Sequence, residues 1–222
     1  MIAGITLPGY LEHLSEKRIQ TIIIFGVFLL QYLFEHVFPE QKKYNDLNNE
    51  GRNGLVGIIN VVLLFIPSAL LVELLSLISK NKIGLLQQFS FPFWLLLPLT
   101  IILMDFFMYW WHRFNHTYKF LWRFHRFHHQ EKKMNSTTVF RFHTFELLLS
   151  TIFKASFYFI IGFTFLPILV YELLFFAAVI VHHSNINITE SFDGVYRQLF
   201  SSPLMHRIHH SQVQEETDTN YG

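Results

Sequence analysis

Long apolar runs separated by short polar segments dominate the pattern of this chain. Three runs, at residues 19–38, 54–79 and 91–111, contain at least 20 residues each. At ~1.5 Å per helical residue, each run can cross a hydrocarbon core of ~30 Å. The polar start, residues 1–18, lacks the basic, apolar and small-residue pattern of a signal peptide, so we expect the first run to remain as a membrane anchor.

A fourth apolar region, residues 145–181, is too long for a single untilted span. Gly162 and Pro167 bracket its middle and predict a break there. We therefore expect two helices of about 17 residues that form a hairpin and return the chain to the side it left. The fold class that follows is all-α and integral to the membrane, with about five transmembrane helices.

Composition supports a membrane protein and restricts the available chemistry. The chain of 222 residues is 51% hydrophobic and contains 26 phenylalanines, which is too apolar for a soluble domain of this size. The net charge of +1 gives no indication of a nucleic-acid partner. There are no cysteines, which excludes thiolate-held zinc or iron clusters and leaves histidines and carboxylates as metal ligands.

Histidines are concentrated beyond what their overall frequency predicts. Residues 112–129 contain five of the 13 histidines, whereas about one is expected (18 × 13/222). His112 and His116 are four residues apart, and two H-x-x-H-H motifs follow at His125 and at His206. Residues three or four apart share a helical face, so each motif presents a pair of imidazoles and a third at an angle. The ligands predicted from these motifs are His112, His116, His125, His128, His129, His206, His209 and His210, with His182 and His183 as a further pair between the two triplets.

The number and type of these ligands indicate two metal ions. Eight or nine imidazoles exceed the four ligands that one zinc ion accepts. A site rich in imidazole and poor in carboxylate suits iron, zinc or copper rather than magnesium or calcium. All the predicted ligands lie on one side of the membrane if the hairpin returns the chain, which gives a His-lined helical cap.

Several further residues have two readings each. Asp105, seven residues before His112, either accepts the second ring proton of a ligand histidine or is a membrane-facing charge that finds a partner elsewhere. His143 either supplies a further ligand or starts a helix and bonds to Glu146, and His182 is a possible additional ligand.

Two charged residues in the hairpin are a separate case. Lys154 and Glu172 are equidistant from Phe163 at the hairpin turn, which predicts an ion pair between them. The alternative is that each side chain reaches independently toward the lipid headgroups.

The distribution of basic residues indicates which side of the membrane the histidine segment faces. If the histidine segment faces the cytoplasm, this segment and the first loop put ten lysines and arginines on that side against four on the other, as the positive-inside rule favours. The ten are Lys42, Lys43, Arg52, Arg113, Lys119, Arg123, Arg126, Lys132, Lys133 and Arg141. We therefore expect an integral membrane protein whose active site faces the cytoplasm.

The motifs D-F-F-M-Y-W-W-H-R-F-N-H, H-R-F-H-H, H-S-N and M-H-R-I-H-H-S, followed by E-T-D-T-N-Y-G, resemble the fatty acid hydroxylase/sterol desaturase superfamily. The pattern is closest to its bacterial sterol-desaturase-like branch. The resemblance covers residues 95–222 and implies a catalytic region there, with residues 1–94 as N-terminal membrane helices. It implies two iron ions, with zinc possible in a purified sample, and O2 as co-substrate. It carries the same eight histidines over as iron ligands, and of the middle pair it fits His183 better than His182 to the H-S-N position, which gives nine.

The reaction implied by this resemblance is hydroxylation or desaturation of a lipid such as a fatty acyl, sterol-like or alkylglycerol substrate. Two departures from the family pattern matter. The family continues past N-Y-G with a segment that contains a Trp-Asp pair, whereas this sequence ends at Gly222. There is no haem-binding domain, so a separate electron donor is expected.

Alternatives from other functional classes predict different metal contents or placements. A zinc-dependent membrane hydrolase needs one metal with an open position and a nearby carboxylate base. A membrane cytochrome needs paired histidines within the bilayer. A non-enzymatic metal-binding membrane protein that carries ions would place its ligands along a path across the membrane. Metal identity and stoichiometry separate these classes.

Overall fold

The computed structural model describes residues 8–221, and within this range the chain is all helical apart from one isolated bridge between Pro39 and Ile186. Five helices are long and apolar enough to cross a membrane. These are α2 (Leu14–Val37), α3 (Leu47–Asn81), α4 (Phe93–Thr117), α6 (Thr144–Ile161) and α7 (Phe165–His183). The prediction of about five apolar helices, the last two joined as a hairpin, is confirmed.

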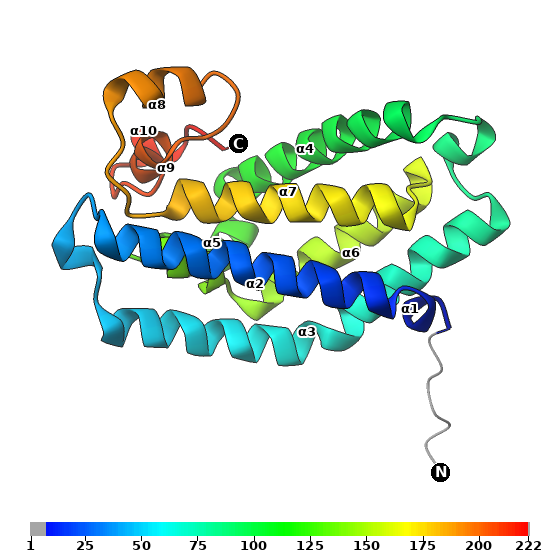
Figure 1. The fold of residues 1–222 in the computed structure, drawn as a ribbon, viewed down its shortest axis with the longest axis horizontal. Helices are drawn as coiled ribbons and strands as arrows, with labels where there is room; N and C mark the ends of the chain where they lie inside the picture. The colour runs from blue at the N-terminus through cyan, green and yellow to red at the C-terminus, as the bar shows by residue number, and fades with distance from the viewer. Residues whose placement is uncertain (1–7, 222) are drawn as a thin grey trace, which may run out of the picture.

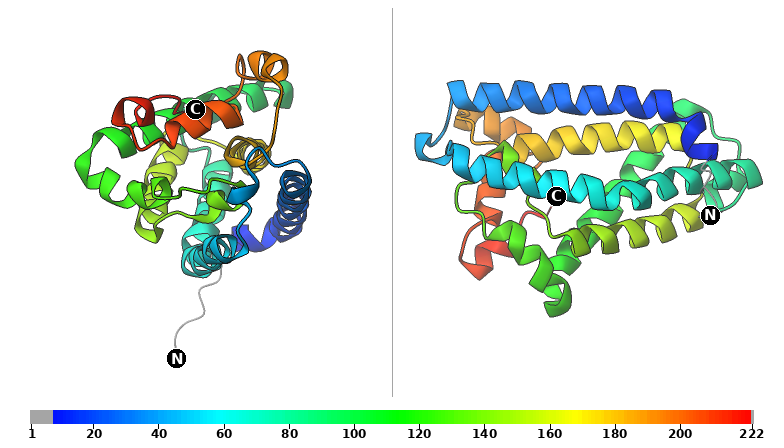
Figure 2. Two further views of the ribbon diagram at one scale, coloured as in Figure 1. Left: turned by 90° about the vertical axis from the view of Figure 1, so that its left-hand side faces the viewer. Right: turned by 90° about the horizontal axis from the view of Figure 1, so that it is seen from below.

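The shorter helices gather mainly at one end of the bundle. Figure 1 shows α5 and α8 to α10 at the end where α4 and α7 finish, and α1 at the opposite end. Figure 2 shows the long helices side by side from two further directions. The short elements are α1 (Pro8–Glu12), η1 (Lys42–Tyr44), η2 (Leu85–Gln88), α5 (Lys119–His129), η3 (Ser136–Phe140), α8 (Glu190–Tyr196), α9 (Pro203–His209) and α10 (Gln214–Thr217).

Two glycines make the turn between α6 and α7 possible. Gly162 ends α6 in the left-handed region with a φ of 83°, and Gly84, in the loop after α3, has a φ of 93°. A Cβ atom on Gly84 would lie 2.4 Å from the backbone nitrogen of Gly162. Only glycine combines this backbone conformation with so close an approach of two loops.

The apolar core lies between α3, α4, α6 and α7, toward the end of the bundle that carries this turn. Its fully buried members include Ile78, Met104 and Phe163. Large apolar side chains elsewhere remain exposed, such as Ile22 on α2 and Val61 on α3, each 71% exposed. An exposed apolar surface of this extent is what a bilayer covers.

The predicted ion pair between Lys154 and Glu172 was wrong. The carboxylate of Glu172 lies 3.7 Å from the Nζ atom of Lys17 and accepts a hydrogen bond from Gln20. The prediction considered the hairpin alone, whereas α2 packs against α7 and α3 packs against α6. Helix neighbours from the start of the chain therefore supply the partners of Glu172.

Candidate metal centre

Nine histidines converge where α4, α5, α7 and α9 meet. They form two groups in which one ring nitrogen of each member lies within 4.8 Å of those of all the others. The five-histidine group contains His112, His116, His125, His129 and His209, and the four-histidine group contains His128, His183, His206 and His210. These nine are the histidines that the sequence motifs single out.

Helix geometry divides each H-x-x-H-H motif between the two groups. On α5, His125 and His129 are four residues apart and join the five-histidine group, whereas His128 points to the other group. On α9 the reverse holds, because His206 and His210 belong to the four-histidine group and His209 to the five-histidine group. Adjacent residues on a helix diverge by about 100°, so one motif reaches both groups.

Several ring nitrogens in both groups face one another with nothing between them. The Nε2 atom of His183 lies 3.0 Å from those of His128 and His206, and the Nε2 atoms of His112 and His209 are also 3.0 Å apart. Among the described residues, both ring nitrogens of His129 are buried without a hydrogen-bond partner. Each such nitrogen costs about 1–3 kcal/mol when left unpaired. This donor set therefore fits metal ions, and each group could hold one.

Oxygen atoms behind the rings fix which nitrogen faces the centre. The Nδ1 atoms of His112, His209 and His183 lie 2.6, 2.6 and 2.8 Å from the backbone carbonyls of Tyr221, Thr219 and Val179. A ring that donates its Nδ1 proton to an oxygen turns an unprotonated Nε2 toward the metal. The oxygen partners thus select the ligand tautomer.

One of these partners is a carboxylate. The Nδ1 atom of His125 lies 2.7 Å from the Oε1 atom of Glu146, and both residues are buried. A carboxylate behind a ligand histidine orients the ring and raises its basicity.

Burial keeps the cap histidines neutral. It lowers the pKa of His209 to about 2, and neighbouring imidazoles lower that pKa further in the same direction. For His125, His128, His129, His206 and His210, burial is again the first cause and neighbouring imidazoles the second, and each pKa lies well below its usual value. Neutral imidazole is the form that binds a metal, so the electrostatics agree with the geometry.

Asp105, His143 and His182 all lie outside the two groups. Asp105 is exposed on α4 and makes no hydrogen bond to an imidazole within residues 8–221. Glu146 and Asp218, not Asp105, are the carboxylates that lie beside rings of the five-histidine group. The Nδ1 atom of His143 accepts a hydrogen bond from the backbone of Phe145 and caps α6, and Glu146 bonds to His125 rather than to it. His182 packs on His206 with ring centroids 4.0 Å apart.

Sequence reasoning missed the partners that stand behind the ligands. Glu146 gave a signal, because a carboxylate in the first turn of an apolar helix is costly unless it has a partner. Asp218 is a second omission, since its Oδ1 atom lies 3.4 Å from the Nδ1 atom of His116. The carbonyls of Thr219 and Tyr221 gave no signal, because every residue carries a carbonyl.

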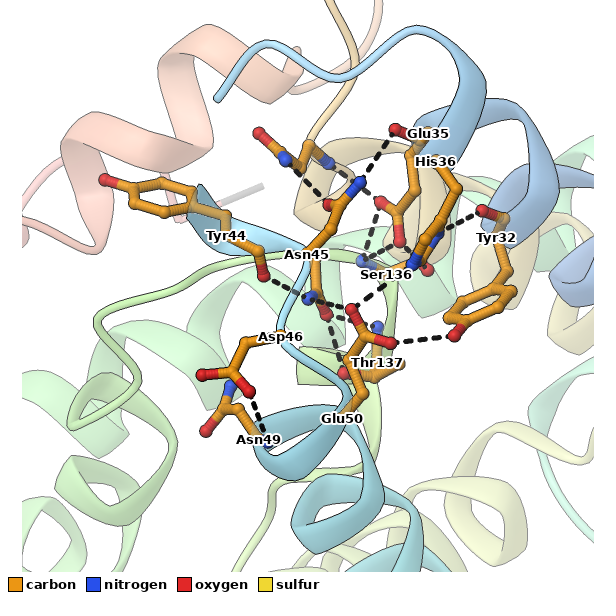
Figure 3. Close-up of polar contacts among 12 residues, drawn as sticks. Tyr32, Glu35, His36, Tyr44, Asn45, Asp46, Asn49, Glu50, Ser136 and Thr137 are labelled. Carbon is orange, nitrogen blue, oxygen red and sulfur yellow. Dashed lines mark hydrogen bonds and ion pairs between the residues drawn. The ribbon is translucent and has the colours of Figure 1, made fainter. Parts of the chain in front are cut away.

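A buried polar network supports the centre from the side of α2. The Glu35 carboxylate is fully buried and accepts hydrogen bonds from the backbone and hydroxyl of Ser136 and from the backbone of Asn185. Figure 3 shows Glu35 beside Ser136, with Asn45 and Glu50 close by. Because Asn185 follows His183 by two residues, Glu35 ties α2 to η3 and to the end of α7 that carries His183.

Comparisons with known proteins agree with these features. The sequence model of the family described as fatty acid hydroxylase matches residues 97–222. The ornithine lipid hydroxylase OlsE of Rhizobium tropici is 27% identical over 234 residues, which cover 100% of this chain and 69% of that protein. No solved structure matches the chain.

Proposed function

The chain belongs to the fatty acid hydroxylase family, and from that premise we propose that it hydroxylates a membrane lipid with O2 at a di-iron centre held by the nine histidines. The observation that carries this proposal is the pair of adjacent imidazole groups at one end of a bundle of apolar helices. One metal per group would give a two-metal site.

The protein's own residues prepare the site for this reaction. Two bound irons would supply the activation of O2 and the oxidation of a C–H bond. The imidazoles are held neutral by burial, and the Glu146 carboxylate and the carbonyls of Thr219 and Tyr221 fix the orientation of three rings. The low exposure of the ligands keeps bulk water away from the reacting atoms.

Hydroxylation is favoured over the other functions considered. The family and the Rhizobium protein are both hydroxylases by name, which supports hydroxylation over desaturation. A zinc hydrolase uses one metal with an open position, whereas the nine histidines form two groups and exceed the ligands that one zinc ion accepts. A carrier that passes ions across the membrane is disfavoured because both groups lie at the same end of the bundle. We further propose that this end faces the cytoplasm, where a separate electron donor reduces the iron.

Ornithine lipid is the first substrate to test, because the Rhizobium relative carries that name. The purified protein, loaded with ferrous iron, is incubated with a chemical reductant, isotopically labelled O2 and the lipid. We expect a lipid product that has gained one labelled oxygen atom. A second reaction with a fatty acid in place of ornithine lipid tests the substrate class.

The control is the His128→Ala variant, which removes a member of the four-histidine group. It should give no product above background under the same conditions. Product formation that is unchanged in His128→Ala, or label that comes from water instead of O2, would contradict the proposal. Metal analysis of the same samples adds an independent check, since a single zinc per chain would favour the hydrolase.

A further inference from the structure

An open cavity of about 720 Å³ lies against the five-histidine group. Residues of α4 form one side and the segment 218–221 forms the other. The ring of Tyr221 lines the cavity, and its centroid is 5.6 Å from that of His112 and 5.1 Å from that of His116. The ring of Tyr221 therefore separates a molecule in this cavity from the histidines.

Two opposite charges line this cavity without pairing with each other. Within the described part of the chain, Arg113 makes no ion pair, and it donates a 3.4 Å hydrogen bond to the hydroxyl of Tyr109 and lies over the ring of Trp110. The Asp218 side chain is 38% exposed, its Oδ1 atom lies 3.4 Å from the Nδ1 atom of His116, and its Oδ2 atom accepts a long hydrogen bond of 3.5 Å from Gln214. A guanidinium and a carboxylate that border the same space yet stay apart are suited to a ligand that carries both an anionic and a cationic group.

An apolar stripe on α4 leads along the membrane helix to this cavity. Ile102, Phe106 and Tyr109 are 65%, 61% and 37% exposed, and their spacing of four and three residues places them on one face with Arg113. A lipid whose chains lie along Ile102 and Phe106 would carry its headgroup to the level of Arg113. The surface thus joins a hydrocarbon-facing stripe to a charged cavity at its end.

From these three observations we propose that the cavity binds the zwitterionic headgroup of a lipid, with its carboxylate or phosphate on Arg113 and its ammonium group on Asp218. This proposal rests on the proposed function, because it assumes that the protein acts on a lipid. It adds the chemical class of the headgroup and the two residues that select it.

Binding without turnover tests this proposal. The full chain is loaded with metal and kept without reductant, and its affinity is measured for ornithine lipid, whose headgroup has a free carboxylate and a free amine. Arg113→Gln and Asp218→Asn should each weaken binding at least about tenfold, the size of a lost charge-assisted hydrogen bond. Arg126→Gln and Glu215→Gln, exposed positions that do not line the cavity, are the matched controls and should bind as the native chain does.

Modified lipids assign each charge to its partner. With the carboxylate methylated, Arg113→Gln should bind as the native chain does, and with the amine acetylated, the same should hold for Asp218→Asn. Phosphatidylethanolamine offers a phosphate in place of the carboxylate and shows which anion the cavity prefers. Metal content is measured in every sample because Asp218 also lies near His116.

The outcomes separate this proposal from the proposed function. Equal binding of all the lipids by all the variants, or a loss for Arg113→Gln that persists with the methylated lipid, would overturn the headgroup assignment. Such a result with oxygen-dependent hydroxylation intact leaves the proposed function in place. Charge-dependent binding without any hydroxylated product contradicts the proposed function alone.

Discussion

At the scale of single residues, the geometry of the histidine groups depends on which ring nitrogen of each imidazole faces the other imidazoles. His125 and His128 are three residues apart on α5, yet they belong to different groups. Their surroundings differ as well, because the Nδ1 atom of His125 contacts Glu146 whereas the Nε2 atom of His128 faces His183. Individual substitutions should therefore affect the two metals unequally.

Replacement of His128 by alanine tests this division. The four-histidine group loses one ligand while all five of the other group remain, so we expect the metal content to fall from about two ions per chain toward about one. Metal analysis of the purified protein measures this. His143→Asn is the control, because His143 lies outside both groups and asparagine preserves the helix cap. Loss of both metals in His128→Ala would show that the groups bind as one unit.

Glu146→Gln tests the carboxylate behind His125. The amide keeps the size of the side chain but removes the charge that stabilises the donated ring proton. We expect metal affinity to decrease by about 10–100-fold while the helical content stays the same. Competition with a chelator measures the affinity, and circular dichroism measures the helix. Glu190→Gln, on the exposed start of α8, should change neither quantity.

At the scale of elements, contacts between helices hold the ligand-bearing segments in place. Glu35 is on α2, which carries no member of either histidine group, but its carboxylate accepts hydrogen bonds from Ser136 and Asn185. The turn at Gly162 fixes how α7 returns toward the histidines. Both features lie outside the motifs that resemble the family.

Glu35→Ala should destabilise the junction of α2, η3 and the segment after α7. The change leaves the backbone donors of Ser136 and Asn185 and the Ser136 hydroxyl buried without an acceptor, which costs about 3 kcal/mol or more in total. We expect a lower thermal midpoint in detergent and faster hydrogen exchange at residues 135–138 and 184–186. Glu12→Ala, an exposed position on α1, provides the comparison. Unchanged exchange in Glu35→Ala would rule out this supporting role.

Gly162→Ala should weaken the hairpin. The added Cβ atom would lie 2.6 Å from the carbonyl oxygen of Ile83, and the backbone has a positive φ that alanine disfavours. We expect a loss of about 1 kcal/mol or more in the free energy of unfolding, measured as a shift in thermal midpoint. Gly26→Ala is the matched control, because nothing lies within 4 Å of its added Cβ atom. Equal stability of the two variants would contradict the packing argument.

At the scale of the whole molecule, the five long apolar helices place the histidines and the loop after α3 at opposite ends of the bundle. The protein contains no cysteine, so single cysteines can report on each end without a background. In intact cells, we expect an impermeant maleimide to label Lys80→Cys, and to label Lys132→Cys only after permeabilisation. The reverse pattern would place the active site on the outer side.

Some parts of the molecule could be predicted from the sequence better than others. The division of the chain at residue 94 stays a prediction, since α3 from the first part packs closely on α6 from the second. The hairpin was predictable because the apolar length of residues 145–181 and the position of Gly162 are local properties. Eight of the nine histidines were predictable because a helical period places them on shared faces within one segment, and His183 followed from the resemblance of H-S-N to the family motif.

The sequence by itself determined the five apolar helices, their hairpin and the set of nine imidazoles, because hydrophobic length and helical spacing act within one segment. Only the tertiary structure decided which histidines form each group, that Glu146 instead of Asp105 contacts a ring, and that Glu172 meets Lys17 instead of Lys154. The physical reason is that these contacts join different helices. Which residues contact one another across helices depends on which helices pack together, and no local sequence pattern specifies that packing.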